Sequence, residues 1–203
     1  MDANQVAALR EILASTGWLE RTRVLGRALR GWPTRSQPTR SQGGLLVVGT
    51  PGEDPWHVTA HLEEEARFGG MPELMPTLVR WSPPPDAPPH LRIGLDRLKD
   101  ARRGERLFVV AAQAAPAGLL ERLNDVRRIG ATIVALDQGD TDLEGLAHEA
   151  LVVSPATCPV SFDAVQHLVS AAAGEDDGRG TRGWRERLAR LLDAISGPVG
   201  ETR

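Results

Sequence analysis

Cysteine and long apolar segments are scarce in this sequence of 203 residues, and each shortage excludes certain classes of protein. Cys158 is the single cysteine, so an internal disulfide or a cysteine metal cluster is excluded, and its apolar neighbours indicate a packed side chain. The longest apolar stretch, Leu107 to Ala112, is far too short to cross a bilayer. Asp2 and Glu11 interrupt the N-terminal segment, which therefore does not resemble a signal peptide. We expect a cytoplasmic protein that does not attach to membranes.

An excess of positive charge is also missing. The chain has 24 Lys and Arg residues against 27 Asp and Glu residues, which gives a formal net charge of −3. The paired arginines at 102–103 and 127–128 fall at predicted helix ends, where cations interact favourably with the helix dipole. Because no basic stripe is visible, we expect no nucleic-acid partner.

The first 43 residues divide into a helical part and a polar part. Apolar residues at helical spacing predict amphipathic helices over 3–15 and 18–29, which must cover either the domain's own sheet or a second subunit. The next segment, PTRSQPTRSQ at 33–42, repeats a five-residue unit and contains no apolar residue except proline. Its composition predicts a flexible linker.

From residue 44 onward, short apolar runs alternate with amphipathic segments. Strands are predicted over 44–50, 77–81, 106–112, 131–138 and 150–154, and helices over 55–70, 91–103, 116–130, 141–149 and 161–174. We expect Asp54 or Gly52, Asp140 or Thr141, and Ser161 to cap three of these helices. Uniformly apolar strands alternating with helices are typical of a parallel sheet covered on both faces. The predicted fold is an α/β three-layer sandwich with a five-stranded parallel sheet and amphipathic helices at both termini.

The chain is predicted to have five parts. They are a helical region at 1–32, a linker at 33–43, an α/β domain at 44–174, a polar linker at 175–183, and a C-terminal helix with its tail at 184–203. The C-terminal helix carries an apolar stripe made of Trp184, Leu188, Leu191, Leu192 and Ile195. We predict that the terminal helices, 3–32 and 184–196, form a homodimer interface or bind a protein partner.

Two loops are the expected ligand-binding positions. Ligands of parallel α/β sheets bind beyond the carboxyl ends of the strands, so the loops at 49–56 and 111–118 are the candidates. The candidate ligand-binding residues are Gly49, Thr50, Gly52 and Gln113.

The segments IGATIVALDQ (129–138) and LEGLAHEALVVS (143–154) resemble the second half of a sugar isomerase (SIS) domain. The segment VVGTPGEDPWHVTAHLEEE (47–65) is similar to the first strand, loop and helix of that family, and VQHLVSAAA (165–173) to its closing helix. The resemblance covers about residues 44–174 and implies a domain that binds phosphosugars. The helical N-terminus is similar to that of phosphoheptose isomerases, in which such helices help to build oligomers.

The loops depart from the family pattern in a way that affects function. SIS domains usually bind phosphate with hydroxyl groups and backbone amides, but residues 111–118 read AAQAAPAG and contain no hydroxyl, while Pro116 has no amide hydrogen. The first loop places Glu53 and Asp54 where a phosphate would be repelled. We therefore expect that this domain does not bind a phosphosugar in the usual manner.

One further motif contains residue types that bind metal ions. His57, His61 and Glu65 (or Glu64) lie on one helix face, and the spacing of His61 and Glu65 resembles the zinc-ligand pair of phosphoheptose isomerases. Gln166 and His167 are the candidate partners from the last helix. The preferred interpretation is a solvated polar face with a His–Glu pair, so no metal or cofactor is expected.

The sequence favours a non-catalytic SIS-like interaction or regulatory module that forms a dimer. One alternative is a small-molecule sensor with a closed pocket lined by Trp56 and the alanines of 111–117. The other is a phosphosugar isomerase with a rearranged site that uses His57, His61, Glu65 and Gln113.

Overall fold

The computed structural model describes residues 17–31 and 44–175, apart from residues 155, 157 and 159. The predicted helix over 3–15, the linker over 33–43 and the C-terminal helix over 184–196 lie outside the described residues.

The strands form one five-stranded parallel sheet in the order β2-β1-β3-β4-β5. Its members are β1 (Leu45–Val48), β2 (Pro76–Val79), β3 (Arg106–Ala111), β4 (Thr132–Asp137) and β5 (Glu149–Val152). The side chains of β1 and β3 are buried along their whole length, as expected for central strands with both faces covered. Each predicted strand is present but shorter, and β2 and β5 begin one residue earlier than predicted, so the predicted sheet is confirmed.

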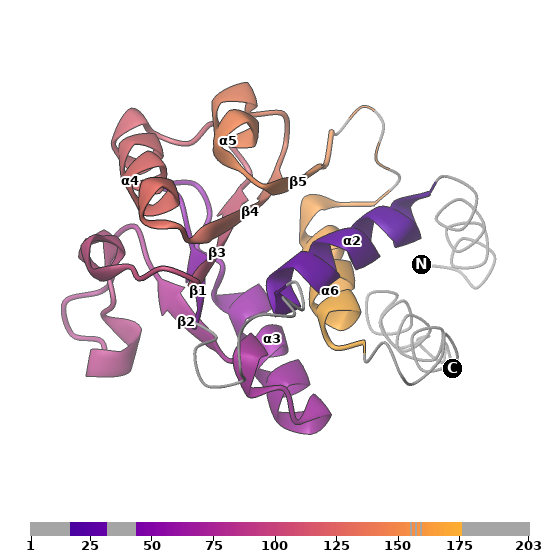
Figure 1. The fold of residues 1–203 in the computed structure, drawn as a ribbon, viewed down its shortest axis with the longest axis horizontal. Helices are drawn as coiled ribbons and strands as arrows, with labels where there is room; N and C mark the ends of the chain where they lie inside the picture. The colour runs from indigo at the N-terminus through magenta and orange to yellow at the C-terminus, as the bar shows by residue number, and fades with distance from the viewer. Residues whose placement is uncertain (1–16, 32–43, 155, 157, 159, 176–203) are drawn as a thin grey trace, which may run out of the picture.

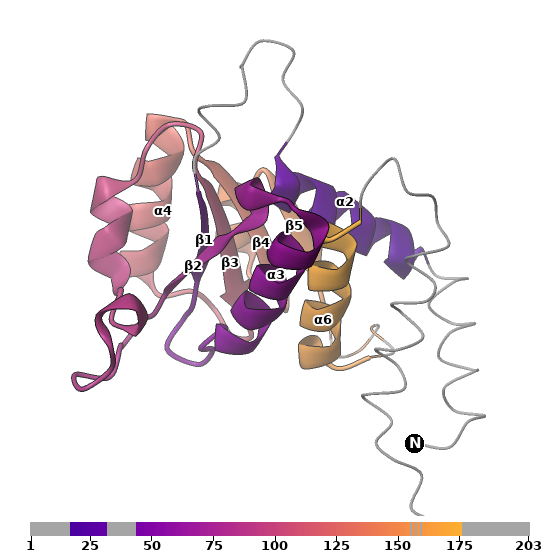
Figure 2. The same cartoon turned by 90° about the horizontal axis from the view of Figure 1, so that it is seen from below.

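Helices cover both faces of this sheet. They are α2 (Trp18–Arg30), α3 (Trp56–Gly69), α4 (Ala117–Ile129), α5 (Thr141–Leu146) and α6 (Phe162–Ala173). Figures 1 and 2 show α2, α3 and α6 on one face and α4 and α5 on the other. The predicted three-layer α/β sandwich is therefore confirmed. Among the described residues, no helix combines the length and the apolar character needed to cross a bilayer.

Successive side chains of each strand point to opposite faces of the sheet, so the hydrophobic core forms two clusters. Val47 packs with the side chains of α2, α3 and α6, whereas Leu46 and Val48 pack with those of α4 and α5. Cys158 packs at the edge of the first cluster, and burial raises the pKa of its thiol, as expected for a structural cysteine.

Helix α2 belongs to the core of its own chain. Leu25 and Leu29 are buried, and Gly26 lies so close to α6 that a Cβ atom placed there would be 2.6 Å from the carbonyl carbon of Ala172. The Arg30 guanidinium donates hydrogen bonds of 3.0 Å to the carbonyl oxygens of Ala172 and Ala173. Of the two surfaces that this helix was expected to cover, α2 therefore covers its own domain.

The helix predicted over 91–103 is wrong in type and length. Short 3-10 helices occupy Pro89–Leu91 and Leu95–Asp100, and a third lies at Pro72–Leu74. The buried carboxylate of Glu105 accepts hydrogen bonds from the Arg97 side chain at 2.5 Å and from the Arg102 amide at 2.8 Å. Because the Arg102 amide donates to Glu105, it is not available for a helical hydrogen bond, and the segment turns toward β3 instead.

Two of the three predicted helix caps are confirmed. The Asp140 carboxylate accepts hydrogen bonds from two amides of α5, and the Ser161 hydroxyl accepts one from the Ala164 amide. At α3, however, the capping position is held by Pro55, which makes no side-chain cap. The Asp54 carboxylate, one residue before the capping position, instead pairs with Arg80 at 3.1 Å.

Candidate functional site

The loop between β1 and α3 is a tight turn. The Thr50 amide donates to the Glu53 carbonyl at 2.9 Å, and the Glu53 amide donates back to the Thr50 carbonyl at 3.2 Å. A Cβ atom at Gly49 would lie 2.6 Å from the Glu53 carbonyl oxygen, so glycine is required for this close approach. The Thr50 hydroxyl is buried, and no hydrogen-bond partner for it is found within the described residues.

The structure brings two of the predicted ligand-binding residues together from separate loops. A Cβ atom placed on Gly52 would lie 3.0 Å from Oε1 of Gln113, so the Gln113 side chain rests on the β1–α3 turn. The contact between Gly52 and Gln113 joins the loops after β1 and β3. Thr50 lies in the same turn but is buried, so its hydroxyl is not presented on the surface.

An acidic side chain already occupies the start of α4. The Ala115 amide donates a hydrogen bond of 2.6 Å to Oδ2 of Asp140, while Oδ1 of Asp140 accepts hydrogen bonds of 3.1 Å from the Asp142 and Leu143 amides. The next residue, Pro116, has no amide hydrogen to offer. The sequence predicted Asp140 only as a helix cap and did not indicate this second contact, which joins residues 25 positions apart.

A second carboxyl group is buried below this loop. Oδ1 of Asp137 accepts hydrogen bonds from the Gly139 amide at 2.7 Å and the Asp140 amide at 2.9 Å. Within the described part of the chain, Oδ2 of Asp137 is buried and has no hydrogen-bond partner. Burial raises the pKa of Asp137, because the charged form is poorly solvated there.

The two acidic residues of the first loop point in different directions. Glu53 accepts a hydrogen bond of 3.1 Å from the Gln166 amide group on α6, and burial raises the pKa of Glu53. Asp54 forms its ion pair with Arg80. The repulsion that we expected from Asp54 is therefore compensated by a neighbouring cation.

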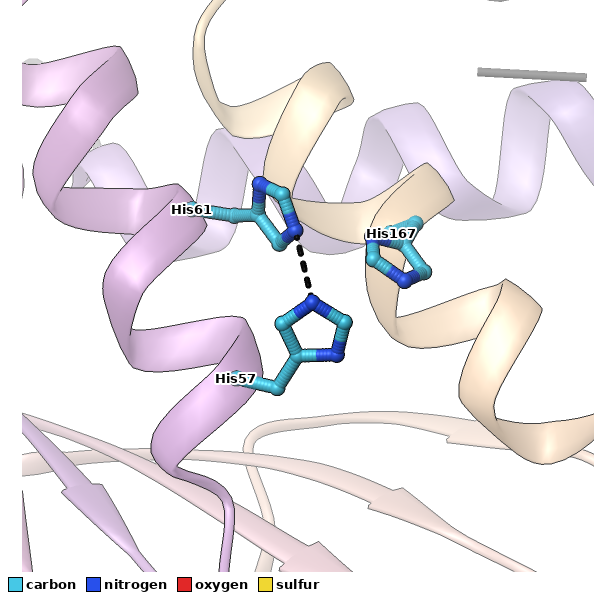
Figure 3. A group of neighbouring side chains, drawn as sticks. All are labelled: His57, His61 and His167. Carbon is cyan, nitrogen blue, oxygen red and sulfur yellow. Dashed lines mark hydrogen bonds between the residues drawn. The ribbon is translucent and has the colours of Figure 1, made fainter. Parts of the chain in front are cut away.

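Three histidines converge beside this turn (Figure 3). His57 and His61 project from successive turns of α3 toward His167 of α6, and the Nε2 atoms of His57 and His61 are 3.2 Å apart. One ring nitrogen from each residue lies within 4.8 Å of the others. We call these three residues the histidine cluster. Its third member is His167, one of the two candidate partners that the sequence offered from the last helix.

The surroundings of the histidine cluster orient its rings. Nδ1 of His61 lies 3.5 Å from a carboxylate oxygen of Glu64. Burial lowers the pKa of His167, and the neighbouring His61 and His57 lower it further. All three rings are partly buried and face one another. Trp56, which was expected in a closed pocket, stacks on His57 and is 57% exposed.

An open cleft of about 750 Å³ lies beyond the end of β2, away from the histidine cluster. Its lining includes Trp81, Pro83, Ile93, Arg92, Arg97, Asp96, Asp100 and Arg122. Buried nitrogens of Arg97 and Arg122 have no hydrogen-bond partner among the described residues. This cleft contains neither Trp56 nor the alanines of 111–117.

Similarity to known proteins is found only at the level of structure. No family model matches this sequence, and no curated protein is similar to it in sequence. A protein from Silicibacter pomeroyi described as a phosphosugar isomerase superposes with a TM-score of 0.54 at 17% identity, over 95% of this chain and 53% of that one. A Salmonella typhimurium protein described as sugar-binding gives 0.52 at 13% identity, over 91% of this chain and 56% of that one.

A third structure matches over nearly its whole length. It is the sugar isomerase domain of an RpiR transcription factor from Sphaerobacter thermophilus, with a TM-score of 0.50 at 16% identity, over 94% of each chain. The present chain thus has the SIS-like α/β fold, and it spans about half the length of the first two proteins. At these identities the similarity establishes the fold alone. The similarity to phosphoheptose isomerases and the loss of isomerase activity stay predictions from the sequence.

Proposed function

We propose that this chain is a non-catalytic regulatory module of SIS-like fold that acts as a dimer and does not bind phosphosugars in the usual manner. The observation that carries the proposal is the hydrogen bond from the Ala115 amide to the Asp140 carboxylate. A phosphate at the start of α4 would have to displace this carboxylate or accept its repulsion.

The rest of the β3–α4 loop contains no hydroxyl donor. Methyl groups stand where hydroxyls would donate, and Pro116 supplies no amide hydrogen. Each charge-assisted hydrogen bond that is lost costs about 1.5–3 kcal/mol of binding free energy. A phosphosugar isomerase must hold its sugar beside a base, and this loop supplies no hydroxyl group to anchor the phosphate. A regulatory role has a counterpart in the same fold, because the matched Sphaerobacter domain belongs to a transcription factor.

The direct test measures binding and turnover of phosphosugars by the full chain. A panel of sugar phosphates at millimolar concentration should leave the melting temperature unchanged, and NMR should detect no isomerisation, with or without zinc. For comparison, a ligand at 100 times its dissociation constant stabilises a protein by about 2.7 kcal/mol.

Matched sugars without phosphate separate specific binding from general solute effects. Saturable stabilisation by a phosphosugar, absent with the free sugar, would overturn the first part of the proposal. Turnover of any member of the panel would establish the isomerase alternative.

The dimer is tested separately by sedimentation equilibrium. Full-length protein should sediment as a homodimer, and the double variant Leu188→Glu, Leu192→Glu should sediment as a monomer because it places charges on the predicted apolar stripe. A monomeric wild-type protein would contradict the predicted assembly.

A second candidate function, small-molecule sensing, is favoured by the open cleft. Trp81 offers an aromatic surface, and the buried guanidinium nitrogens of Arg97 and Arg122 lack partners within the described residues. A ligand with a planar ring and an anionic group matches this lining. Adenosine monophosphate is a suitable probe for this cleft. If the protein senses such a ligand, the probe should stabilise it saturably, and Arg122→Gln should weaken that stabilisation. No stabilisation by the probe would exclude this class of ligand.

A further inference from the structure

The spacing of the histidine cluster matches the spacing of ligands around a metal ion. Zinc binds imidazole nitrogens at about 2.0–2.1 Å, which places two ligands of a tetrahedral ion about 3.3 Å apart. The Nε2 atoms of His57 and His61 are 3.2 Å apart, and a nitrogen of His167 lies within 4.8 Å of both. Closing the separation of the His167 nitrogen from within 4.8 Å to about 3.3 Å would complete three vertices of the tetrahedron.

A hydrogen bond alone does not account for all three rings. The His57–His61 contact can be satisfied when one nitrogen donates and the other accepts. The ring centroid of His167 nevertheless lies 4.6 Å from that of His57 and 4.5 Å from that of His61. A single cation bound between the nitrogens would use the lone pairs of all three rings at once.

A carboxylate lies beside the ring nitrogen of His61 that faces away from the cluster. Nδ1 of His61 faces Glu64 at 3.5 Å, while its Nε2 atom faces the cluster. Histidines that bind metals commonly donate their second ring N–H to a carboxylate, which directs the free lone pair at the ion. Glu64 thus acts as a positioning residue for His61.

The two helices hold the ligands in place before any ion binds. On α3, Val58 and Leu62 follow His57 and His61 and are buried in the core, and on α6 the same is true of Leu168 after His167. Packing of these neighbours fixes the backbone from which each ring projects. The partial exposure of the rings leaves access for an ion from solvent.

We propose that the histidine cluster binds one zinc ion through His57, His61 and His167. Three neutral nitrogen ligands suit zinc and related transition metals, whereas magnesium and calcium prefer oxygen ligands. Three protein ligands leave the fourth position for water or for an atom of a bound molecule. This inference does not depend on the proposed regulatory function, because it rests only on the contacts between α3 and α6.

The test is isothermal titration of tag-free, full-length protein with zinc chloride after removal of metals by chelation. Wild-type protein should bind one zinc ion per chain, and magnesium chloride should give no binding. His57→Asn, His61→Asn and His167→Asn should each weaken zinc affinity by at least about tenfold.

The matched control is His148→Asn, which changes a histidine outside the cluster. Nδ1 of His148 accepts a hydrogen bond from the Ile133 amide at 3.0 Å, and an asparagine oxygen can replace that acceptor. This variant should bind zinc like the wild type. Wild-type protein without saturable zinc binding would overturn the proposal, as would cluster variants that bind as tightly as the control.

A second measurement on wild-type protein does not depend on how the variants fold. Proton–nitrogen NMR of the imidazole rings should show shifts of the His57, His61 and His167 nitrogens on addition of zinc, with His148 unchanged. Shifts confined to other histidines would assign the zinc to a different site and reject the cluster.

Discussion

The carboxylate of Asp140 accepts a hydrogen bond from the backbone amide of Ala115 across 2.6 Å. The same carboxylate caps α5 through the amides of Asp142 and Leu143. One acidic side chain therefore connects the starts of α4 and α5 at the carboxyl edge of the sheet. This connection leaves the β3–α4 loop with an internal anion where related folds could accept one from a ligand.

Asp140→Ala should destabilise the protein through loss of these contacts. Loss of a helix cap costs about 0.5–2 kcal/mol of unfolding free energy, and the amide of Ala115 also loses its acceptor. Urea unfolding followed by circular dichroism measures the change. Asp142→Ala alters an exposed acidic residue on the same helix and should have a much smaller effect. Equal stability of the two variants would show that the Asp140 contacts contribute little.

Gly26→Ala should destabilise the protein because α2 and α6 are in close contact at this residue. The added methyl group would lie 2.6 Å from a backbone carbon of Ala172, and overpacking of this kind costs about 1–3 kcal/mol. Gly145→Ala is the control, since nothing lies within 4 Å of a Cβ atom there, and it should be neutral or slightly stabilising. Thermal unfolding of the full chain compares them. A tolerated Gly26→Ala would mean that α2 does not pack on α6 in solution.

Asp137→Asn should stabilise the protein at neutral pH and lose this advantage in acid. Burial raises the pKa of Asp137 in the folded chain, so the folded state binds the proton more readily than the unfolded state. The cost of the charged form is fully present above the folded-state pKa and disappears as the pH falls below the unfolded-state pKa, about 3.9. Melting temperatures of both proteins from pH 4 to pH 8 measure the difference. A variant that is less stable at every pH would show that the carboxylate itself is needed by the Gly139 and Asp140 amides.

Glu64→Gln should weaken zinc binding without changing its stoichiometry. Removal of a carboxylate that orients a metal-binding histidine typically costs 10–100-fold in affinity, and the exposure of Glu64 places the expected loss near the lower figure, about tenfold. Competition with a chelating dye measures the affinity. Glu63→Gln, which changes a carboxylate paired with Arg67, is the control and should leave the zinc affinity unchanged. A larger loss for Glu65→Gln would restore the His61–Glu65 pair that the sequence spacing suggested.

Local patterns were sufficient to predict most of the fold. The apolar runs of β1 and β3 are buried on both sides, and the caps at Asp140 and Ser161 depend only on neighbours within a few residues. The segment at 91–103 was predicted as a helix because its apolar spacing is helical, and Leu98 and Ala101 are indeed buried. The competing hydrogen bonds of Glu105 were not visible in that spacing.

The candidate site was predicted less completely. Helical spacing placed His57 and His61 on one face of α3, and the position of Gly52 and Gln113 in loops after β1 and β3 predicted a shared edge. His167 was recognised only as one of two candidates, because helical periodicity does not determine which face of α6 meets α3. Glu65 was preferred on spacing alone.

The amino-acid pattern was enough to predict the alternation of strands and helices and the parallel sheet, and it contains the loss of hydroxyls from residues 111–118. These features follow from side-chain chemistry and from burial that repeats along a short stretch of chain. The meeting of His167 with His57 and His61, and the hydrogen bond from the Ala115 amide to Asp140, became visible only in the folded chain. Those contacts join residues that are far apart in the chain, and they exist because the parallel sheet brings the starts of its helices to one edge and packs α3 beside α6.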